Sequence, residues 1–226
     1  MTATIKTGGT LTVGTGAIIQ AGSVAPTNVS YDGVVDTRVG GNTSLNFSLN
    51  SFPEGSLMIL CVGCTDQNVP TAAGWSLVTS NTAGVGNGHA VGIYSKVKSG
   101  DTAVTTFSSS GNMGGFVTSY SDASNVNAFA QTDSSFNTTL SYPGPNSNPV
   151  AAGSLVVRFG FVDSGGTLTF NPFSGHTKIA QNTTDTGKGV VLWHYDSQAG
   201  GTLSAGSHSF GSFSAYGTGT TIVINN

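Results

Sequence analysis

Short runs of apolar residues alternate with polar residues along most of the chain, and they predict β-strands. The segment 44–50 (SLNFSLN) places its apolar residues on one face and its Ser and Asn residues on the other, which is the two-residue period of a half-buried strand. The segments 56–64 (SLMILCVGC) and 154–163 (SLVVRFGFVD) are almost continuously apolar, as expected for strands covered on both faces. Further strands are expected at 89–97, 103–109, 115–122, 187–197, 206–217 and 219–225, between turns rich in Gly, Asn and Asp.

These segments amount to roughly nine or ten short strands, which is the pattern of a sandwich or barrel. The composition disfavours long helices, because Glu occurs only at position 54 and no long window combines a 3.6-residue apolar period with helix caps. We therefore predict an all-β fold, an antiparallel β-sandwich of jelly-roll type.

The strand pattern also contains an approximate internal repeat. The triplet GSL at 55–57 recurs at 153–155, and VGIY at 91–94 is matched by VVLW at 190–193. This nearly constant offset predicts two pseudo-repeated halves of one sandwich. Two small domains would fit the pattern as well, but a single domain is favoured because each half alone has too few strands to cover its apolar faces.

The N-terminal residues differ from the rest of the chain, and we divide it into a segment 1–32 and a sandwich domain 33–226. The segment combines β alternation with pairs of glycines, and so short a segment cannot bury its own apolar residues. We predict that it is an attachment arm that packs against the main domain or a neighbouring subunit. Its contact residues would be Ile5, Leu11, Val13, Ile18 and Ile19.

Charge is sparse, with 8% charged residues and a net charge of −3. Nucleic-acid binding needs a clustered basic face, and the nearest candidate pair, Lys96 and Lys98, is interpreted as two solvated lysines on one strand. No stretch approaches about 18 apolar residues, so no membrane insertion is expected. The first residues also lack the apolar core of an ordinary signal peptide.

The residues able to carry chemistry are few and scattered. The four histidines and the single Glu stand in no motif for nucleophilic or acid–base catalysis, so no enzymatic activity and no cofactor are expected. Asp66 with Asn68, or Asp122 with Asn125 and Asn127, could hold Ca²⁺. A local Asx-turn is the favoured interpretation in both places, and no metal site is predicted. Cys61 and Cys64 lie three positions apart on one strand, which favours buried free thiols over a disulfide.

The order of several segments resembles a β-sandwich module of bacteriophage virion proteins. The matching segments are PEGSLMIL, AAGWSLV, VGIYSKVKSGDTAVTTF, GGFVTSYSDASNVNAF and AAGSLVVRFGF. They extend over about residues 34–226, and the second half departs from the pattern at Gly175-His176, where the Trp is absent. The resemblance implies a capsid decoration protein, a head fibre or a tail adhesin.

We therefore expect a non-enzymatic virion structural protein, a capsid decoration (cement) or head-fibre protein held by its N-terminal arm. Its partners would be the major capsid protein or neighbouring subunits. We expect a homo-oligomer, specifically a trimer. It would assemble in the host cytoplasm and be displayed on the virion surface. The alternative is a carbohydrate-binding adhesin or receptor-binding module that contacts a host surface glycan through aromatic side chains. Trp75 and Tyr142 are the candidate glycan contacts, Tyr142 because the proline-rich sequence SYPGPNSNP predicts that it lies in a loop.

Overall fold

The computed structural model describes residues 28–40, 43–83, 88–108, 112–144, 150–163, 168–183, 188–195, 200–210 and 215–226. Within these ranges the chain forms fifteen β-strands and no helix, which confirms the all-β prediction. Every strand pair is antiparallel. No helix in the described ranges could therefore cross a membrane.

Two five-stranded sheets form the middle of the molecule. The first contains β1 (Ser30–Gly40), β3 (Leu57–Cys64), β5 (Ser76–Ala83), β6 (His89–Val97) and β8 (Met113–Ser121), in the order β1-β8-β3-β6-β5. The second contains β9 (Asn125–Asn137), β11 (Leu155–Asp163), β12 (His176–Asn182), β13 (Lys188–Tyr195) and β15 (Ala215–Asn225), in the order β12-β13-β11-β15-β9. Their inner faces pack against each other, as in other β-sandwiches.

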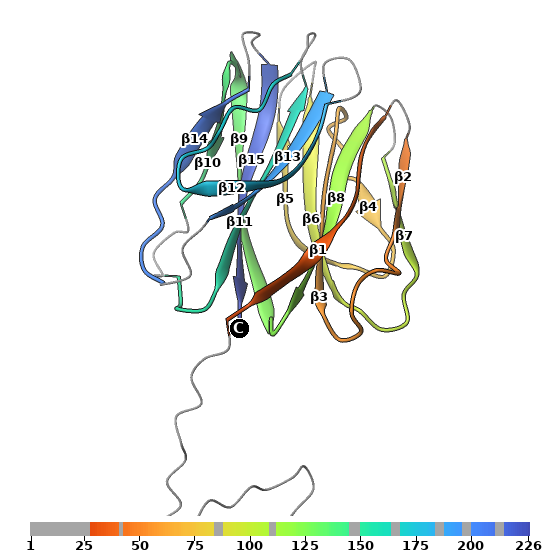
Figure 1. The fold of residues 1–226 in the computed structure, drawn as a ribbon. Helices are drawn as coiled ribbons and strands as arrows, with labels where there is room; N and C mark the ends of the chain where they lie inside the picture. The colour runs from red at the N-terminus through yellow and green to blue at the C-terminus, as the bar shows by residue number, and fades with distance from the viewer. Residues whose placement is uncertain are drawn as a thin grey trace, which may run out of the picture.

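A smaller sheet covers the outer face of each large one, so the molecule has four layers (Figure 1). The outer sheet of the first half contains β2 (Ser44–Ser48), β4 (Thr71–Ala72) and β7 (Ala103–Phe107), in the order β2-β7-β4. The outer sheet of the second half pairs β10 (Thr139–Tyr142) with β14 (Gly206–Ser209). In Figure 1 these smaller sheets form the right-hand and left-hand sides of the molecule.

The strand order within each half resembles that of a jelly roll, which folds eight antiparallel strands into two facing sheets, but β5 and β12 extend the large sheets instead of the small ones. In the first half, β1-β8-β3-β6 faces β2-β7-β4. In the second half, β9-β15-β11-β13 faces β10-β14, which is the same order with β9 in the place of β1 and β15 in the place of β8. Among the described strands, only β4 has no counterpart in the other half. This correspondence is what the predicted pseudo-repeat requires, although the duplication of sequence itself stays a prediction.

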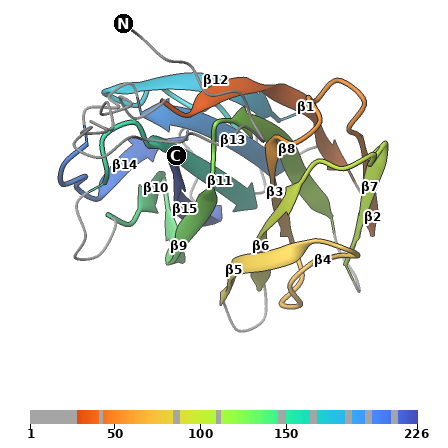
Figure 2. The same cartoon turned by 90° about the horizontal axis from the view of Figure 1, so that it is seen from below.

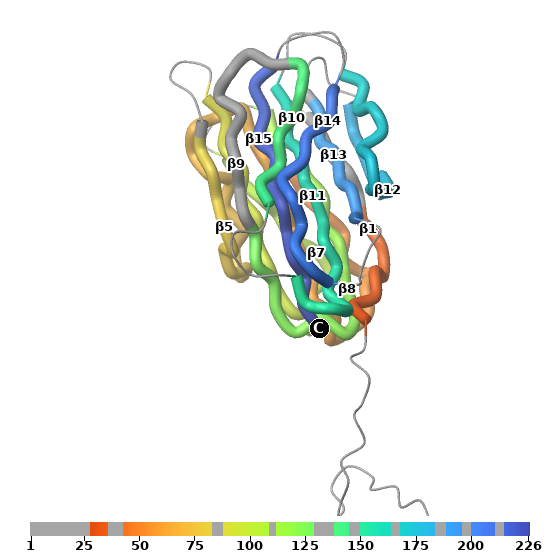
Figure 3. Tube along the Cα trace, turned by 90° about the vertical axis from the view of Figure 1, so that its left-hand side faces the viewer, coloured from red at the N-terminus to blue at the C-terminus, as the bar shows by residue number. Residues whose placement is uncertain are grey.

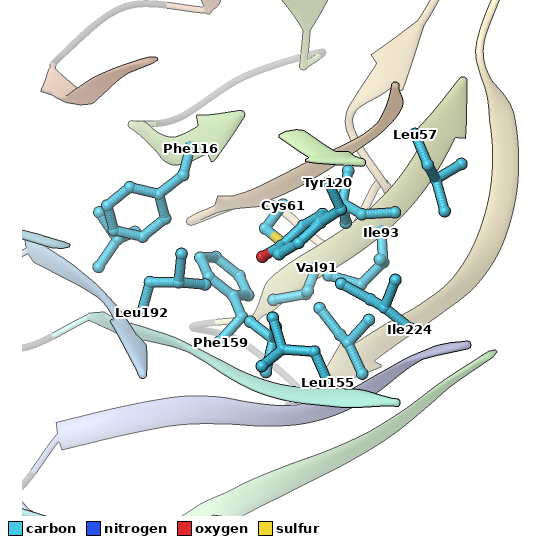
Figure 4. Packing of buried hydrophobic residues seen from close by; sticks show 14 of the residues in the cluster. Leu57, Cys61, Val91, Ile93, Phe116, Tyr120, Leu155, Phe159, Leu192 and Ile224 are labelled. Carbon is cyan, nitrogen blue, oxygen red and sulfur yellow. The ribbon is translucent and has the colours of Figure 1, made fainter. Parts of the chain in front are cut away.

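Three large hydrophobic clusters fill the spaces between the layers. The central cluster joins Cys61 and Phe116 of the first half to Leu155 and Phe159 of the second (Figure 4), and the rings of Phe116 and Phe159 meet edge to face with centroids 5.8 Å apart. Two outer clusters lie between each large sheet and its smaller one. Both halves share the central cluster, and each half also has a core of its own.

The two-sided core explains the continuous apolar runs in the sequence. All eight residues of β3 are buried, because its odd-numbered side chains enter the central cluster and its even-numbered ones, such as Met58 and Leu60, enter the outer cluster of the first half. β11 is buried in the same way on both faces. A strand with water on one side would alternate apolar and polar residues instead.

Several strands lie where the sequence pattern gave no clear signal. The structure adds β1, β4, β5, β9, β10 and β12 to the strands expected from the sequence, and its last strand begins at Ala215, inside the segment 206–217 that was expected to be a separate strand. These additional strands are short, or lie at a sheet edge with polar residues on both faces. Only the presence of a neighbouring strand settles their conformation.

Candidate functional site: a groove between two edge strands

A concave surface lies where the two large sheets meet at one edge of the sandwich. β5 is the last strand of the first sheet and β9 is the last strand of the second. Figures 2 and 3 both place these two strands side by side. A groove of about 520 Å³ separates them.

The groove has an apolar floor that continues the central core. Leu57, Val78, Val126 and Ala128 line it, and the last three are partly buried against the central cluster. Leu77 stands at the rim with 53% of its surface exposed. The central core therefore extends to the surface at this edge, because no further strand covers β5 and β9 there in the part of the chain that the structure describes.

The polar lining of the groove consists of hydroxyl and amide groups. Its members are Ser76, Ser95, Ser124, Asn125 and Asn127. Two of them are fixed by the C-terminus, since Ser124 Oγ donates to the Asn226 carbonyl oxygen (2.7 Å) and Asn125 Oδ1 accepts from Asn225 Nδ2 (2.7 Å). The lining contains no ionisable side chain and no aromatic ring, so the groove offers apolar contact and hydrogen bonding but no acid–base chemistry.

A second unusual feature is a buried arginine in the outer core of the second half. Arg158 of β11 is 1% exposed, and its Nη2 donates to the Ser204 carbonyl oxygen at 2.8 Å. Its guanidinium carbon lies 5.6 Å from the ring centre of Tyr142 and 5.4 Å from that of Phe173. These cation–π contacts take the place of a carboxylate partner, and burial lowers the pKa of Arg158 to about 10.

Polar atoms without a hydrogen-bond partner in the described structure gather around this arginine. They are Nε and Nη1 of Arg158, both ring nitrogens of His208, the Tyr142 hydroxyl and the Trp193 indole nitrogen. Burial, reinforced by the charges of His176 and Lys178, lowers the pKa of His208 to about 4. Aromatic rings occupy the space around these groups, since His208 stacks on Tyr142 and Phe173 at centroid distances of 5.5 and 5.6 Å. Among the described residues, these polar groups are therefore buried between aromatic rings.

The two predicted glycan contacts differ in their exposure to solvent. Tyr142 is 0% exposed and stacks on Phe173 with a centroid distance of 5.4 Å, so it has no ring face to offer to a sugar. Its placement in a loop was wrong, because the residue closes β10 and points into the outer core. Trp75 is half-buried against the outer core of the first half, so part of its surface remains accessible.

The predicted arm contacts Ile5, Leu11, Val13, Ile18 and Ile19 lie outside the described residues. Val29, near the start of the described chain, donates its backbone N–H to the Gly153 carbonyl oxygen at 2.9 Å. The chain therefore enters the sandwich next to the loop before β11.

The interpretation of Lys96 and Lys98 as two solvated lysines was wrong for Lys98. Lys98 follows the last residue of β6 and is 5% exposed, with its Nζ 3.2 Å from Glu54 Oε1 and bonded to the Asp101 carbonyl oxygen. Lys96 Nζ lies 2.6 Å from Asp101 Oδ1. Both lysines therefore fix the turn after β6, because the turn carbonyl and carboxylate give them local partners that the strand pattern did not reveal.

Cys61 and Cys64 are free and buried, as expected, and they enter different hydrophobic clusters. Asp66 and Asn68 form the expected Asx-turn, in which Asp66 Oδ1 accepts from the Asn68 backbone N–H at 3.2 Å. No group of three metal-ligating side chains occurs among the described residues.

His89 and His194 are buried between the two large sheets. His89 Nε2 lies 2.7 Å from Thr218 Oγ1 between the two large sheets, and burial lowers its pKa. His194 Nε2 lies 3.3 Å from the Tyr120 hydroxyl in the same interior. Both histidines bridge the two halves.

Comparison of the chain with protein-family models, curated proteins and solved structures finds no match.

Proposed function

We propose that this chain is a non-enzymatic structural protein of a bacteriophage virion, a capsid decoration or head-fibre protein that attaches through its N-terminal segment. The observation that carries the proposal is the groove between β5 and β9. It joins two strands that end their sheets in the described part of the chain to exposed apolar surface, and it has no ionisable lining. This combination suits contact with another protein segment better than chemistry on a small substrate.

The architecture supports the same proposal. Jelly rolls are common in viral capsid proteins and in lectins. The short strands, the scarcity of charge and the resemblance of residues 34–226 to phage virion modules favour the first of these classes. Attachment to the major capsid protein, or to neighbouring subunits of a homo-oligomer such as a trimer, would bury the apolar edges.

The test is deletion of residues 2–26. We expect the truncated protein to keep its β-sheet circular dichroism spectrum and cooperative thermal unfolding but to be absent from purified particles. A conservative control, Lys6→Gln, should decorate particles normally, because the apolar positions of the arm are intact. Full occupancy of particles by the truncated protein would contradict attachment through this segment.

The carbohydrate-binding alternative depends on Trp75, since Tyr142 is buried. A glycan array compares the wild-type protein with Trp75→Ala, and glycan binding that this change removes would replace the virion proposal. We expect no glycan to bind, because Trp75 is half-buried against the outer core of the first half and sugar sites draw much of their affinity from exposed aromatic rings.

A further inference from the structure

We propose that the groove between β5 and β9 is the docking site for residues 10–19 of this same chain, which add to the exposed sheet edges as an extended strand. The segment reads TLTVGTGAII. The use of this contact in a particle rests on the proposed virion function, whereas the contact itself is a property of the isolated protein.

The groove has the two features that strand addition requires. Among the described strands, β5 and β9 each end a sheet, so an added strand could form main-chain hydrogen bonds along their outer edges. Between them, an apolar floor can take every second side chain of an added strand. Exposed, unpaired edges beside apolar surface are a liability that proteins usually cover, and Leu77 at 53% exposure marks the part left uncovered.

The N-terminal segment matches the groove in pattern and charge. Leu11 and Val13 are two positions apart, so in an extended strand both point to one face while Thr10 and Thr12 point to the other. Lys6 is the one charged residue among positions 2–26. An uncharged, alternating segment therefore meets a groove without ionisable groups, and its apolar face can cover Val78, Val126 and Ala128.

A continuous set of contacts leads from the start of the described chain to one end of the groove. Val29 is bonded to Gly153, Ser154 Oγ donates to Asn225 Oδ1 at 3.0 Å, and Asn225 donates to Asn125 in the groove lining. Residues 20–27 can span up to roughly 26 Å when extended. The width of a five-stranded sheet is about 19 Å between its outer strands. The segment can therefore reach the groove of its own molecule or that of a neighbour in contact.

A sugar is a poorer occupant of the groove. Lectin sites place an aromatic ring against the sugar face, and the lining here contains only aliphatic, serine and asparagine side chains. An extended peptide needs no ring, because its backbone bonds to the strand edges.

The first experiment measures binding of a fluorescent peptide with the sequence of residues 8–20 to the protein that lacks residues 2–26. We expect saturable binding. Leu77→Glu should weaken it by at least about tenfold, because a carboxylate would be desolvated at the rim. The matched control is Phe107→Glu, since Phe107 is also 53% exposed but lies on β7 in the outer sheet. A peptide with Leu11→Asp and Val13→Asp should not bind.

Two results of this experiment would overturn the inference. One is the absence of peptide binding at millimolar concentration, and the other is equal affinity for the Leu77→Glu variant and the wild-type sandwich. Both are independent of particle attachment, so failure of the virion proposal leaves this measurement unaffected.

The second experiment traps the contact in the full chain. Val13→Cys combined with Ala128→Cys should form a disulfide under mild oxidation, whereas Val13→Cys combined with Phe107→Cys should not. The native cysteines are buried and give little background. Mixing singly substituted copies of different mass tells whether the segment crosses to a neighbour. Equal cross-linking to positions 128 and 107 would overturn the inference.

Discussion

Gly63 of β3 and Phe161 of β11 lie face to face across the interface between the two large sheets. A Cβ atom placed on Gly63 would stand 2.4 Å from Phe161 Cγ, far inside van der Waals contact. β3 and β11 are the central strands of their sheets, and positions 63 and 161 are each the seventh residue of their strand. The two halves therefore have a glycine and a large aromatic residue at corresponding positions. The Phe161 ring occupies the space that a side chain at position 63 would need.

Substitution of Gly63 by Ala should destabilise the protein by about 1–3 kcal/mol, because the added methyl group overpacks the interface. Both the neighbouring Phe161 and the backbone of β3 are buried, so neither can move outward without disturbing other contacts. Urea unfolding followed by circular dichroism measures the change.

The double variant Gly63→Ala with Phe161→Leu provides the control for this mechanism. The smaller Leu frees space for the methyl group, so the double variant should lose less stability than the sum of the two single changes. Strict additivity would show that the cost at position 63 has another origin.

Tyr142 should tolerate loss of its hydroxyl group but not of its ring. Its hydroxyl is buried without a hydrogen-bond partner in the described structure, so Tyr142→Phe should change the free energy of unfolding by less than about 1 kcal/mol, with stabilisation as the favoured sign. Tyr142→Ala should cost about 3–5 kcal/mol, because it leaves a cavity beside Phe173. Chemical denaturation of both variants tests this, and a large loss in the Phe variant would reveal a hidden partner for the hydroxyl.

His208 should make the protein less stable as the pH falls. The folded-state pKa of His208 is lowered from 6.5 to about 4 by burial and by the nearby positive charges, so the unfolded chain takes up a proton first. The free energy of unfolding should therefore decrease between about pH 6.5 and pH 4, by up to about 3 kcal/mol from this residue.

The variant His208→Phe keeps a ring in the stack but cannot titrate, so its stability should depend less steeply on pH over the same range. Some dependence should remain, because burial also lowers the pKa of His89. Urea midpoints between pH 7 and pH 4.5 provide the comparison. Equal pH slopes for the wild-type and variant proteins would exclude this role for His208.

Neither cysteine should react with a thiol reagent in the native protein. Cys61 is 1% exposed and Cys64 is 0% exposed, and burial raises the pKa of both thiols, so the reactive thiolate is scarce and inaccessible. The two thiols should therefore react with a chromogenic disulfide reagent no faster than the protein unfolds, and the absorbance of the released product measures this rate. A Val97→Cys variant, whose position is 56% exposed, should react at once and serves as the control.

The sequence predicted the strands that pass through the interior, because their periodicity reports burial directly. β3 and β11 carry apolar residues on both faces, and β2 alternates. The same reasoning failed for β5 and β10, where short or polar segments adopt strands only because a neighbour provides hydrogen bonds. Tyr142 was assigned to a loop for this reason, since the prolines that follow it dominate the local pattern.

The groove could not be predicted from the sequence. Its lining comes from four separate strands and one turn, including Leu57, Leu77, Ser95 and Val126, and none of these residues forms a motif with its neighbours in sequence. One partial signal was present, because Leu77 and Val78 are apolar residues beside a polar edge segment. The pairing of that segment with the start of β9 depends on the packing of the two sheets.

The contact of Gly63 with Phe161 also limits how the two halves can be recombined. If the chain were cut near Asp122, each fragment would carry a large sheet whose inner face fits the other fragment but not a second copy of itself. Two second-half fragments would bring Phe161 against Phe161, and two first-half fragments would leave a void at Gly63. The fragments should therefore reassemble from a mixture as a heterodimer, and neither should form a well-packed homodimer alone. The inner surfaces of the two halves are complementary and are not interchangeable.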